Sequence, residues 1–117
     1  MTGEFWTDLE SDVTDPAFAR EFAAESVRIA TIDALVNQLD EAREVAGLSK
    51  AALARAVGAD PAVIRRLFSA PHVNPTIGTL AEVAAALGYK VQLELMSEAE
   101  RARVTEPMRR ASCIVSQ

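Results

Sequence analysis

The side chains with the clearest chemistry are two adjacent arginines, Arg65 and Arg66. A guanidinium group can donate two parallel hydrogen bonds to the O6 and N7 edge of guanine, or it can bind a phosphate. We expect one of the pair to contact a base and the other to hold the nucleic-acid backbone. Taken alone, the two arginines suit a solvated helix face equally well, so the surrounding elements must decide.

Residues suited to catalysis or metal binding form no pattern. The one histidine, His72, lies in a loop between prolines, and the one cysteine, Cys113, has no candidate base close in sequence. No His or Cys spacing suits a metal ion. Neither a glycine-rich phosphate loop nor a nucleophile elbow occurs. We therefore expect no enzymatic activity, no cofactor and no metal site.

The stretch before and through the arginines has the spacing of a helix-turn-helix, in which two short helices cross near a right angle. Ala54 provides a small residue at the crossing, and Gly58 tolerates the left-handed backbone of the turn. The apolar positions that would lock the pair to a core are Leu53, Val57, Ile64 and Leu67. The rival interpretation is an ordinary helical hairpin in a bundle.

Capping residues and glycines predict the helix boundaries. Asp15-Pro16 begins a helical stretch that ends at Gly47, either as one helix or as two with a joint near Thr31 or Asp33. Three further helices begin after Ser49, Asp60 and Thr79 and end near Val57, Phe68 and Gly88. Thr79 followed by Glu82 three residues later has the pattern of a capping box.

The period changes after Gly88. Apolar and polar residues alternate over 89–95, which predicts a short strand. A lone strand leaves backbone groups unpaired, so we expect it to pair with a second copy or with another protein. The residues assigned to dimerisation are Tyr89, Val91, Leu93 and Leu95. The tail 96–117 could hold a short helix before Pro107 and a second strand in CIVSQ.

Residues 31–87 resemble the lambda-repressor-like domain of the XRE/Cro class. The resemblance lies in AREVAGLSKAALARAVGADPAVIRRLF and NPTIGTLAEVAAALG, and its most specific part is 74–88. The chain over about 15–95 is similar to HigA-type antitoxins, in which a segment like DPAFAREF precedes the domain and a strand like YKVQLEL follows. The family often has Gln where Lys50 stands, and a recognition helix richer in Ser and Gln, so the preferred DNA sequence stays open.

The resemblance implies an antitoxin that neutralises a RelE/HigB-like endoribonuclease toxin by direct binding and represses its own operon. Two alternatives stay open. One is a stand-alone XRE-type repressor with no toxin, and the other is an interaction protein that no longer binds DNA.

In such domains the second motif helix enters the major groove of double-stranded operator DNA. The DNA contacts expected here are Ser49, Lys50, Ala62, Arg65, Arg66, Ser69, Asn74 and Thr76. Because these offer few basic groups per copy, we expect a homodimer on the DNA.

Charge is distributed unevenly along the chain. Residues 1–44 hold eleven Asp or Glu against three Arg, a balance of −8, whereas residues 45–117 hold six against nine Lys or Arg, a balance of +3, which together give −5. The acidic part is either the solvated face of a stabilising helix or a surface for a basic toxin. The aromatic residues that could anchor such a partner are Phe5, Trp6, Phe18 and Phe22.

The expected fold class is all-α: a lambda-repressor-like helix-turn-helix bundle with an N-terminal helical extension and a short C-terminal strand. The expected parts are an acidic segment (1–30, helical from about 16), the helix-turn-helix domain (31–88), the pairing strand (89–95) and a tail (96–117).

No apolar run approaches the roughly 18 residues needed to cross a bilayer. The acidic start differs from a signal peptide, and a single cysteine suits a reducing compartment. These features predict a cytoplasmic protein with no membrane contact.

Overall fold

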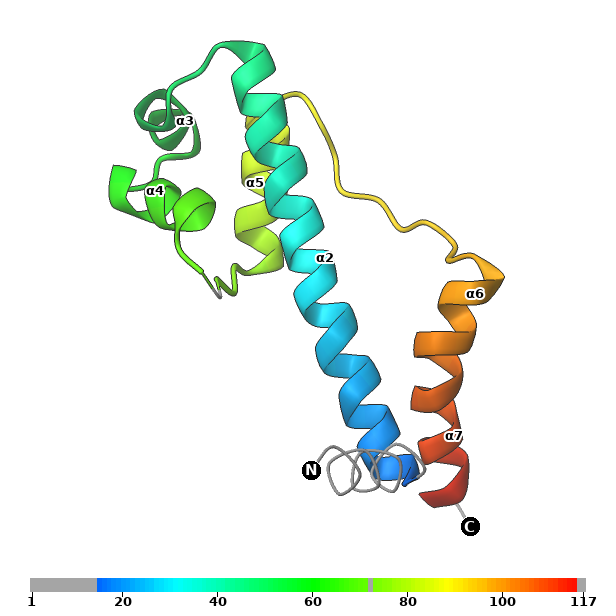
Figure 1. Ribbon diagram of the computed structural model, residues 1–117. Coiled ribbons are helices and arrows are strands. Elements are labelled where there is room, and N and C mark those ends of the chain that lie inside the picture. The colour runs from blue at the N-terminus through cyan, green and yellow to red at the C-terminus, as the bar shows by residue number, and fades with distance from the viewer. Residues whose placement is uncertain (1–14, 72, 116–117) are drawn as a thin grey trace, which may run out of the picture. The chain divides into compact units, whose positions relative to one another are not determined.

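The computed structural model describes residues 15–71 and 73–115, and its regular elements are all helical (Figure 1). In chain order they are α2 (Pro16–Ala46), α3 (Lys50–Val57), α4 (Pro61–Ser69), α5 (Ile77–Ala86), α6 (Glu98–Glu100), the π-helical turn η1 (Arg101–Thr105) and α7 (Glu106–Val115). One compact unit comprises Ile29–Leu93, and the other combines the chain up to Arg28 with the chain from Glu94. No described helix has both the length and the apolar character needed to span a bilayer.

The first helical stretch is one helix, so the alternative with a joint near Thr31 or Asp33 is wrong. Asp15 caps α2, because its Oδ1 accepts a hydrogen bond from the Ala17 amide at 2.9 Å. Thr31 and Asp33 are exposed and lie inside the helix, where a polar side chain can simply face water. Gly47, with φ of 72°, ends α2 as expected.

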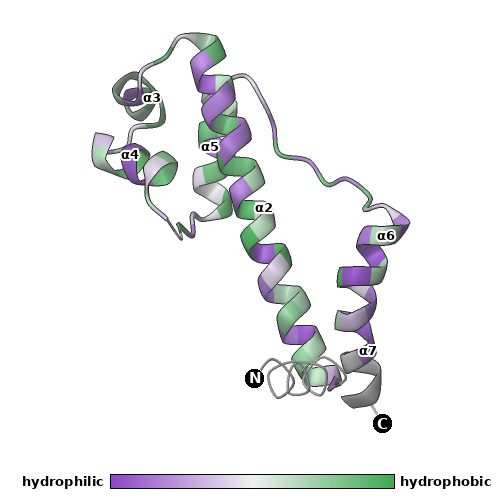
Figure 2. Cartoon of the chain, viewed as in Figure 1, coloured by the Kyte–Doolittle hydropathy of each residue, from purple (hydrophilic) through white to green (hydrophobic). Residues whose placement is uncertain are grey.

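The core of the Ile29–Leu93 unit is apolar and comes from four helices. The C-terminal part of α2 contributes Leu39, which is buried, and α5 is largely hydrophobic (Figure 2). The buried residues of this core are Leu39, Leu53, Ala54, Ile64, Leu67, Leu80, Val83 and Ala84. Burying a Leu, Ile or Val side chain contributes about 1.5–3 kcal/mol each. The predicted inward positions of the motif are therefore correct, with Val57 packed at the edge of the core.

The start of α5 differs from the prediction. Its N-cap is Thr76, whose Oγ1 accepts a hydrogen bond from the Thr79 amide at 3.1 Å. The predicted cap, Thr79, instead lies in the first turn, three residues into the helix. The helix begins at Ile77, so Gly78 lies within its first turn. The expected end holds, since Gly88 follows the helix with φ of 90°.

The predicted strand over 89–95 is wrong. These residues form an irregular connection between α5 and α6, and the described residues contain no strand (Figure 1). A strand needs a neighbour to satisfy its backbone N–H and C=O groups. Within the described part of the chain, no other extended segment offers one. The alternating apolar pattern therefore has nothing to pack against, and Leu93 and Leu95 are fully or largely exposed.

The C-terminal tail is helical to Val115, so the second strand expected over 113–117 is wrong for 113–115, and 116–117 lie outside the described residues. The helix does not stop at Pro107. Because proline lacks an N–H and its ring crowds the preceding turn, a regular α-helix is strained there. The wider turn η1 lies just before it, and the Glu106 amide bonds to the Arg101 carbonyl five residues back.

A capping box begins α6. The Ser97 amide donates to Glu100 Oε1, and the Glu100 amide donates to Ser97 Oγ, both at 3.1 Å. The backbone N–H of Ser97, then its hydroxyl, and then the nearby Arg103 hold the pKa of Glu100 below its usual range. The carboxylate is therefore part of what fixes the start of this helix.

Candidate nucleic-acid interface

The turn between α3 and α4 has the geometry that the motif requires. Gly58 has φ of 67°, in the left-handed region. Its amide donates to the Arg55 carbonyl at 3.2 Å, and the Ala59 amide donates to the Ala54 carbonyl at 2.9 Å. These two bonds close the end of α3 in a Schellman motif. Ala54 is completely buried, which allows α4 to pack closely against α3. The prediction of a helix-turn-helix at these residues is confirmed.

The start of α4 follows the predicted cap. The Asp60 carboxylate accepts a hydrogen bond from the Ala62 amide at 2.8 Å, and Pro61 takes the first helical position. Ile64 and Leu67 are buried, which turns the opposite side of the helix outward. Capping and burial thus fix which face of α4 can meet a ligand.

The outward face of α4 carries four of the predicted DNA contacts. Arg65, Arg66 and Ser69 are exposed, and Ala62 is half-buried at the start of the helix. No hydrogen bond or ion pair joins the side chain of Arg65 or Arg66 to another residue in the described ranges. Both guanidinium groups are therefore available to an acceptor from outside the chain, such as a guanine edge or a phosphate.

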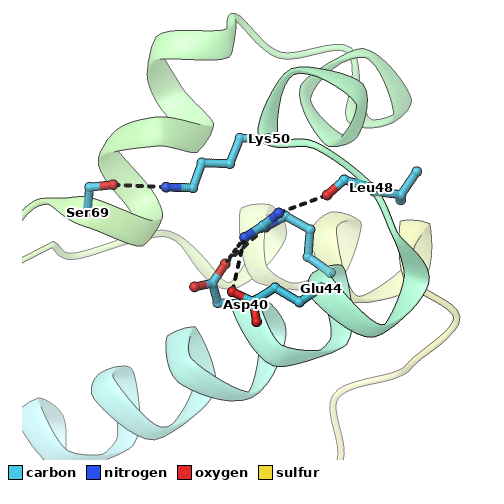
Figure 3. Close-up of polar contacts among 6 residues, drawn as sticks. Asp40, Glu44, Leu48, Lys50 and Ser69 are labelled. Carbon is cyan, nitrogen blue, oxygen red and sulfur yellow. Dashed lines mark hydrogen bonds and ion pairs between the residues drawn. The ribbon is translucent and has the colours of Figure 1, made fainter.

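Two further predicted contacts lie at the start of α3. Ser49 caps that helix, with its Oγ accepting a hydrogen bond from the Ala52 amide at 3.0 Å. Lys50 Nζ donates to Ser69 Oγ at 3.2 Å, across to the last residue of α4 (Figure 3). The structure thus brings the start of α3 and the end of α4 together, although Lys50 and Ser69 are 19 residues apart in sequence.

The last two predicted contacts lie beyond α4. Asn74 is exposed in the loop, and Thr76 is the exposed cap of α5. The Thr76 hydroxyl is already engaged with the Thr79 amide and, at 3.0 Å, with the Thr79 hydroxyl. In the described residues no hydrogen bond connects these two to the Ser49, Lys50 and Ser69 group. Their role as phosphate contacts stays a prediction.

Arg43 is an important residue that the sequence analysis missed. Its side chain is only 13% exposed. It pairs with Asp40 Oδ1 through Nε at 2.9 Å and Nη2 at 2.8 Å, and its Nη1 donates to the Leu48 carbonyl at 2.8 Å. Its Cζ also lies 5.9 Å from the centre of the Phe68 ring, within reach of a cation–π interaction.

Arg43 therefore joins three parts of the domain: α2, the loop before α3, and the C-terminal end of α4. Figure 3 shows the Asp40 and Glu44 carboxylates and the Leu48 carbonyl joined by dashed lines to the same guanidinium group. The only sequence signal is an acidic residue three positions before an arginine, which also occurs at exposed sites. The nearness of Phe68, 25 residues later, becomes visible only in the folded chain.

The predicted partner contacts divide into two groups. Phe5 and Trp6 lie outside the described residues. Phe18 and Phe22, in the first two turns of α2, stack with their ring centres 6.3 Å apart. Phe18 is half-buried, whereas Phe22 is 62% exposed. The four predicted dimerisation residues are all exposed, at 59% for Tyr89, 40% for Val91, 103% for Leu93 and 84% for Leu95.

A comparison with protein families gives an independent result. Residues 39–93 match the family described as Helix-turn-helix. No curated protein and no solved structure is significantly similar to the chain. The matched segment contains α3, α4 and α5, together with the end of α2. The chain therefore carries a DNA-binding helix-turn-helix domain of the XRE/Cro-like type.

Proposed function

We propose that this protein is the DNA-binding antitoxin of a type II toxin–antitoxin module, which represses its own operon and neutralises a RelE/HigB-like endoribonuclease. The observation that carries the DNA-binding part is the pair Arg65 and Arg66. Both are exposed on the outer face of α4, within a motif whose cap, turn and core are fully formed. In a helix-turn-helix this face lies against base edges in the major groove.

The contacts divide by chemistry. One arginine binds a guanine edge and the other binds the backbone, while Ala62 can touch a thymine methyl group. Ser49, Lys50 and Ser69 form one group at the adjoining ends of α3 and α4. These short polar and basic side chains suit phosphate oxygens, which position the protein without reading sequence.

The basic footprint of one copy is small, so the operator complex contains two copies. Within 45–88 the cationic side chains are Lys50, Arg55, Arg65 and Arg66. Each phosphate that the protein neutralises adds about one unit to the slope of the logarithm of the binding constant against the logarithm of salt concentration. This electrostatic contribution supplies much of the affinity for DNA, so few contacts per copy give weak binding. Two copies on a two-fold symmetric site double the contacts.

Toxin neutralisation is the finer part of the proposal and draws on the resemblance to HigA-type antitoxins. Phe22 and Ile29 are 62% and 52% exposed on α2, and large exposed apolar side chains of this kind favour a protein contact. Within α2, Glu21 pairs with Arg20 and Glu25 pairs with Arg28, which offsets part of the acidic charge there. The antitoxin would act sterically, by covering the RNA-binding surface of the toxin.

The first test is titration of the purified protein with the DNA upstream of its own gene at several salt concentrations. Arg65→Ala and Arg66→Ala should each weaken binding by about 1–3 kcal/mol. Substituting the arginine that reads a base should abolish discrimination at one operator position. Substituting the arginine that binds phosphate should lower the dependence of the binding constant on salt concentration by about one unit of logarithmic slope. Arg103→Ala, an exposed arginine outside residues 39–93, is the matched control and should bind like the wild type.

The toxin part is tested separately by copurification with the protein encoded next to this one. Phe22→Asp should abolish copurification and leave operator binding intact. If both variants of the recognition helix bind operator like the wild type, the repressor function is wrong. If no neighbouring protein copurifies while operator binding persists, the alternative of a stand-alone repressor is correct.

A further inference from the structure

The C-terminal end of α4 is closed differently from the ends of the neighbouring helices. α2, α3 and α5 each lead into a glycine with positive φ, namely Gly47, Gly58 and Gly88. α4 instead leads into Ala70, whose backbone is extended, with φ of −79° and ψ of 142°. A left-handed residue after a helix lets the chain form additional backbone hydrogen bonds to the last turn. At α4 the Ala70 amide bonds to the Arg66 carbonyl at 3.0 Å, so the last turn depends more on side-chain contacts.

Two cationic side chains from other elements contact that last turn. Lys50 Nζ donates to Ser69 Oγ at 3.2 Å (Figure 3). Arg43 Cζ lies 5.9 Å from the centre of the Phe68 ring, and Phe68 also packs against the apolar core. Phe68 and Ser69 are the last two residues of α4. Contacts from α2 and α3 therefore replace part of the closure that the backbone provides at the other helix ends.

Arg43 is suited to fixing the helix end because its own position is fixed. Its Nε and Nη2 contact Asp40 Oδ1, and its Nη1 donates to the Leu48 carbonyl. All three guanidinium nitrogens are thus engaged within the protein, and the side chain is only 13% exposed. A guanidinium plane held in this way gives the neighbouring aromatic ring a defined contact. Any effect of Arg43 on DNA binding must therefore be indirect.

The residues that face DNA in the proposed complex belong to the same part of α4. Arg65 and Arg66 immediately precede Leu67 and Phe68, and the Arg66 carbonyl accepts the hydrogen bond that closes the helix. A displacement of the last turn therefore moves the backbone of both arginines. Two parallel hydrogen bonds to a guanine edge require a defined geometry, and a binding group must be held within about 0.5 Å of it.

We propose that Arg43 is a positioning residue for operator recognition: through Phe68 it fixes the last turn of α4, and with it the placement of Arg65 and Arg66 on the DNA. The effect on recognition rests on the proposed function. The effect on the end of α4 is a property of the free protein. The two effects are measured in separate experiments, so that they can fail independently.

The first experiment uses hydrogen exchange of the full-length protein without DNA. Arg43→Met keeps an apolar side chain of similar reach and removes the guanidinium group. The Ala70 amide should exchange roughly tenfold faster in this variant, because the last turn of α4 opens more often. The Ala59 amide, which closes α3 by a 2.9 Å bond to the Ala54 carbonyl, should change much less. The ratio of the two rates separates local opening of α4 from a general loss of stability.

The second experiment titrates Arg43→Met with the DNA upstream of the gene, at a temperature where circular dichroism shows that the variant is folded. Binding should weaken roughly tenfold, a size typical of residues that act through a direct contact. The logarithmic dependence of the binding constant on salt concentration should stay unchanged, because no phosphate contact is removed. A slope lowered by about one unit would instead assign Arg43 a direct phosphate contact and overturn the positioning role.

Phe68→Leu tests the route of the effect, since it keeps an apolar side chain and removes the ring. Alone it should weaken operator binding about as much as Arg43→Met does. The double variant should bind no more weakly than the weaker single variant, because both substitutions break one contact. Arg28→Met is the matched control: Arg28 also follows an acidic residue by three positions, but its side chain is 56% exposed. It should change neither operator binding nor exchange at Ala70.

The outcomes distinguish this proposal from the proposed function. The positioning role is overturned if exchange at Ala70 rises only in step with exchange at Ala59, or if the losses of the two single variants multiply in the double variant. If the wild type binds operator and Arg43→Met binds equally tightly, the positioning role is wrong while the repressor function stands. If the wild type binds no operator, the repressor function fails and the effect on recognition fails with it, whereas exchange at Ala70 still decides whether Arg43 fixes the end of α4.

Discussion

The N-terminal and C-terminal halves of α2 carry the same acid–arginine spacing in different surroundings. Asp40 precedes Arg43 by three residues, and Glu25 precedes Arg28 by three. The side chains of the first pair are 13% exposed at the arginine and 33% at the aspartate, whereas both side chains of the second are 56% exposed. An exposed ion pair contributes about 0–1 kcal/mol, whereas hydrogen bonds to a charged group contribute about 1.5–3 kcal/mol when they are sheltered.

The apolar residues of α2 divide in the same way. Toward the C-terminal end, Leu35, Val36 and Leu39 pack on the helix-turn-helix core. Toward the N-terminal end, Phe22 and Ile29 are more than half exposed. A single helix thus has one part that packs on the helix-turn-helix core and another that leaves large apolar side chains exposed. An acidic residue three positions before an arginine can therefore either anchor a domain or form an exposed ion pair on its surface.

The largest expected difference lies between a core residue and an exposed apolar residue. Leu53→Ala should lower the free energy of unfolding by about 2–5 kcal/mol, because Leu53 is completely buried and its loss leaves a cavity. Phe22→Ala should change it by less than about 1 kcal/mol, since the ring is 62% exposed. Urea denaturation followed by circular dichroism measures both. Equal losses would contradict the contrast between the buried core and the exposed apolar residues of α2.

The two arginines offer the most direct comparison. Arg43→Ala should cost about 1–3 kcal/mol, because it leaves the Leu48 carbonyl and Asp40 without their partner. Arg28→Ala should cost less than about 0.5 kcal/mol, as expected of an exposed pair. The same denaturation experiment at low and high salt distinguishes the two ion pairs, because only the exposed pair of Arg28 should weaken as the salt concentration rises. A cost for Arg28→Ala as large as for Arg43→Ala would refute the assignment of Arg43 as the anchor.

A smaller effect is expected at the turn of the motif. Gly58→Ala should cost about 1–2 kcal/mol, because φ of 67° is unfavourable for a residue with a side chain. No atom lies within 4 Å of the added methyl group, so the cost is conformational and not steric. Gly78→Ala is the control, since Gly78 is helical and the substitution there should stabilise slightly or do nothing. Thermal unfolding distinguishes the two.

The smallest effect is expected at the capping box of α6. The pKa of Glu100 is lowered in the folded chain, so its carboxylate stabilises the folded state above the pKa of the unfolded chain. That contribution is lost as the pH falls through the folded pKa. Glu100→Gln should remove this acid dependence and lower stability at neutral pH slightly, toward the value that the wild type has in acid. Hydrogen exchange of the Ser97 amide at pH 3 and pH 7 measures it, and an unchanged pH dependence in the variant would exclude this role.

Much of the DNA-binding motif could be predicted from sequence because its signals are local. Ser49, Gly58 and Asp60 each act within a few residues, through a cap or a left-handed turn. The choice of Thr79 as the cap of α5 failed because Thr76 offers the same chemistry one turn earlier. Both threonines can cap a helix, and only Thr79 has a glutamate three residues later, yet the helix begins at Ile77 with Thr76 as its cap.

Features that depend on a distant partner could not be predicted in this way. The alternation over 89–95 is a real pattern, but strand formation requires a neighbour that the described chain lacks. The role of Arg43 depends on Phe68, which approaches it only after α4 has packed. In both cases the missing information concerns what lies beside a residue in space.

The exposed face of α4 has a consequence for how such a protein can diversify. The side chains of Arg65 and Arg66 make no hydrogen bond or ion pair with other described residues, while Ile64 and Leu67 on the opposite side hold the helix in the core. Substitutions at the two arginines therefore leave the folded state nearly unaffected. Under the proposed function, operator preference can therefore drift through these two positions over generations while the scaffold is inherited unchanged, so duplicated copies of the gene could acquire separate targets in few mutational steps.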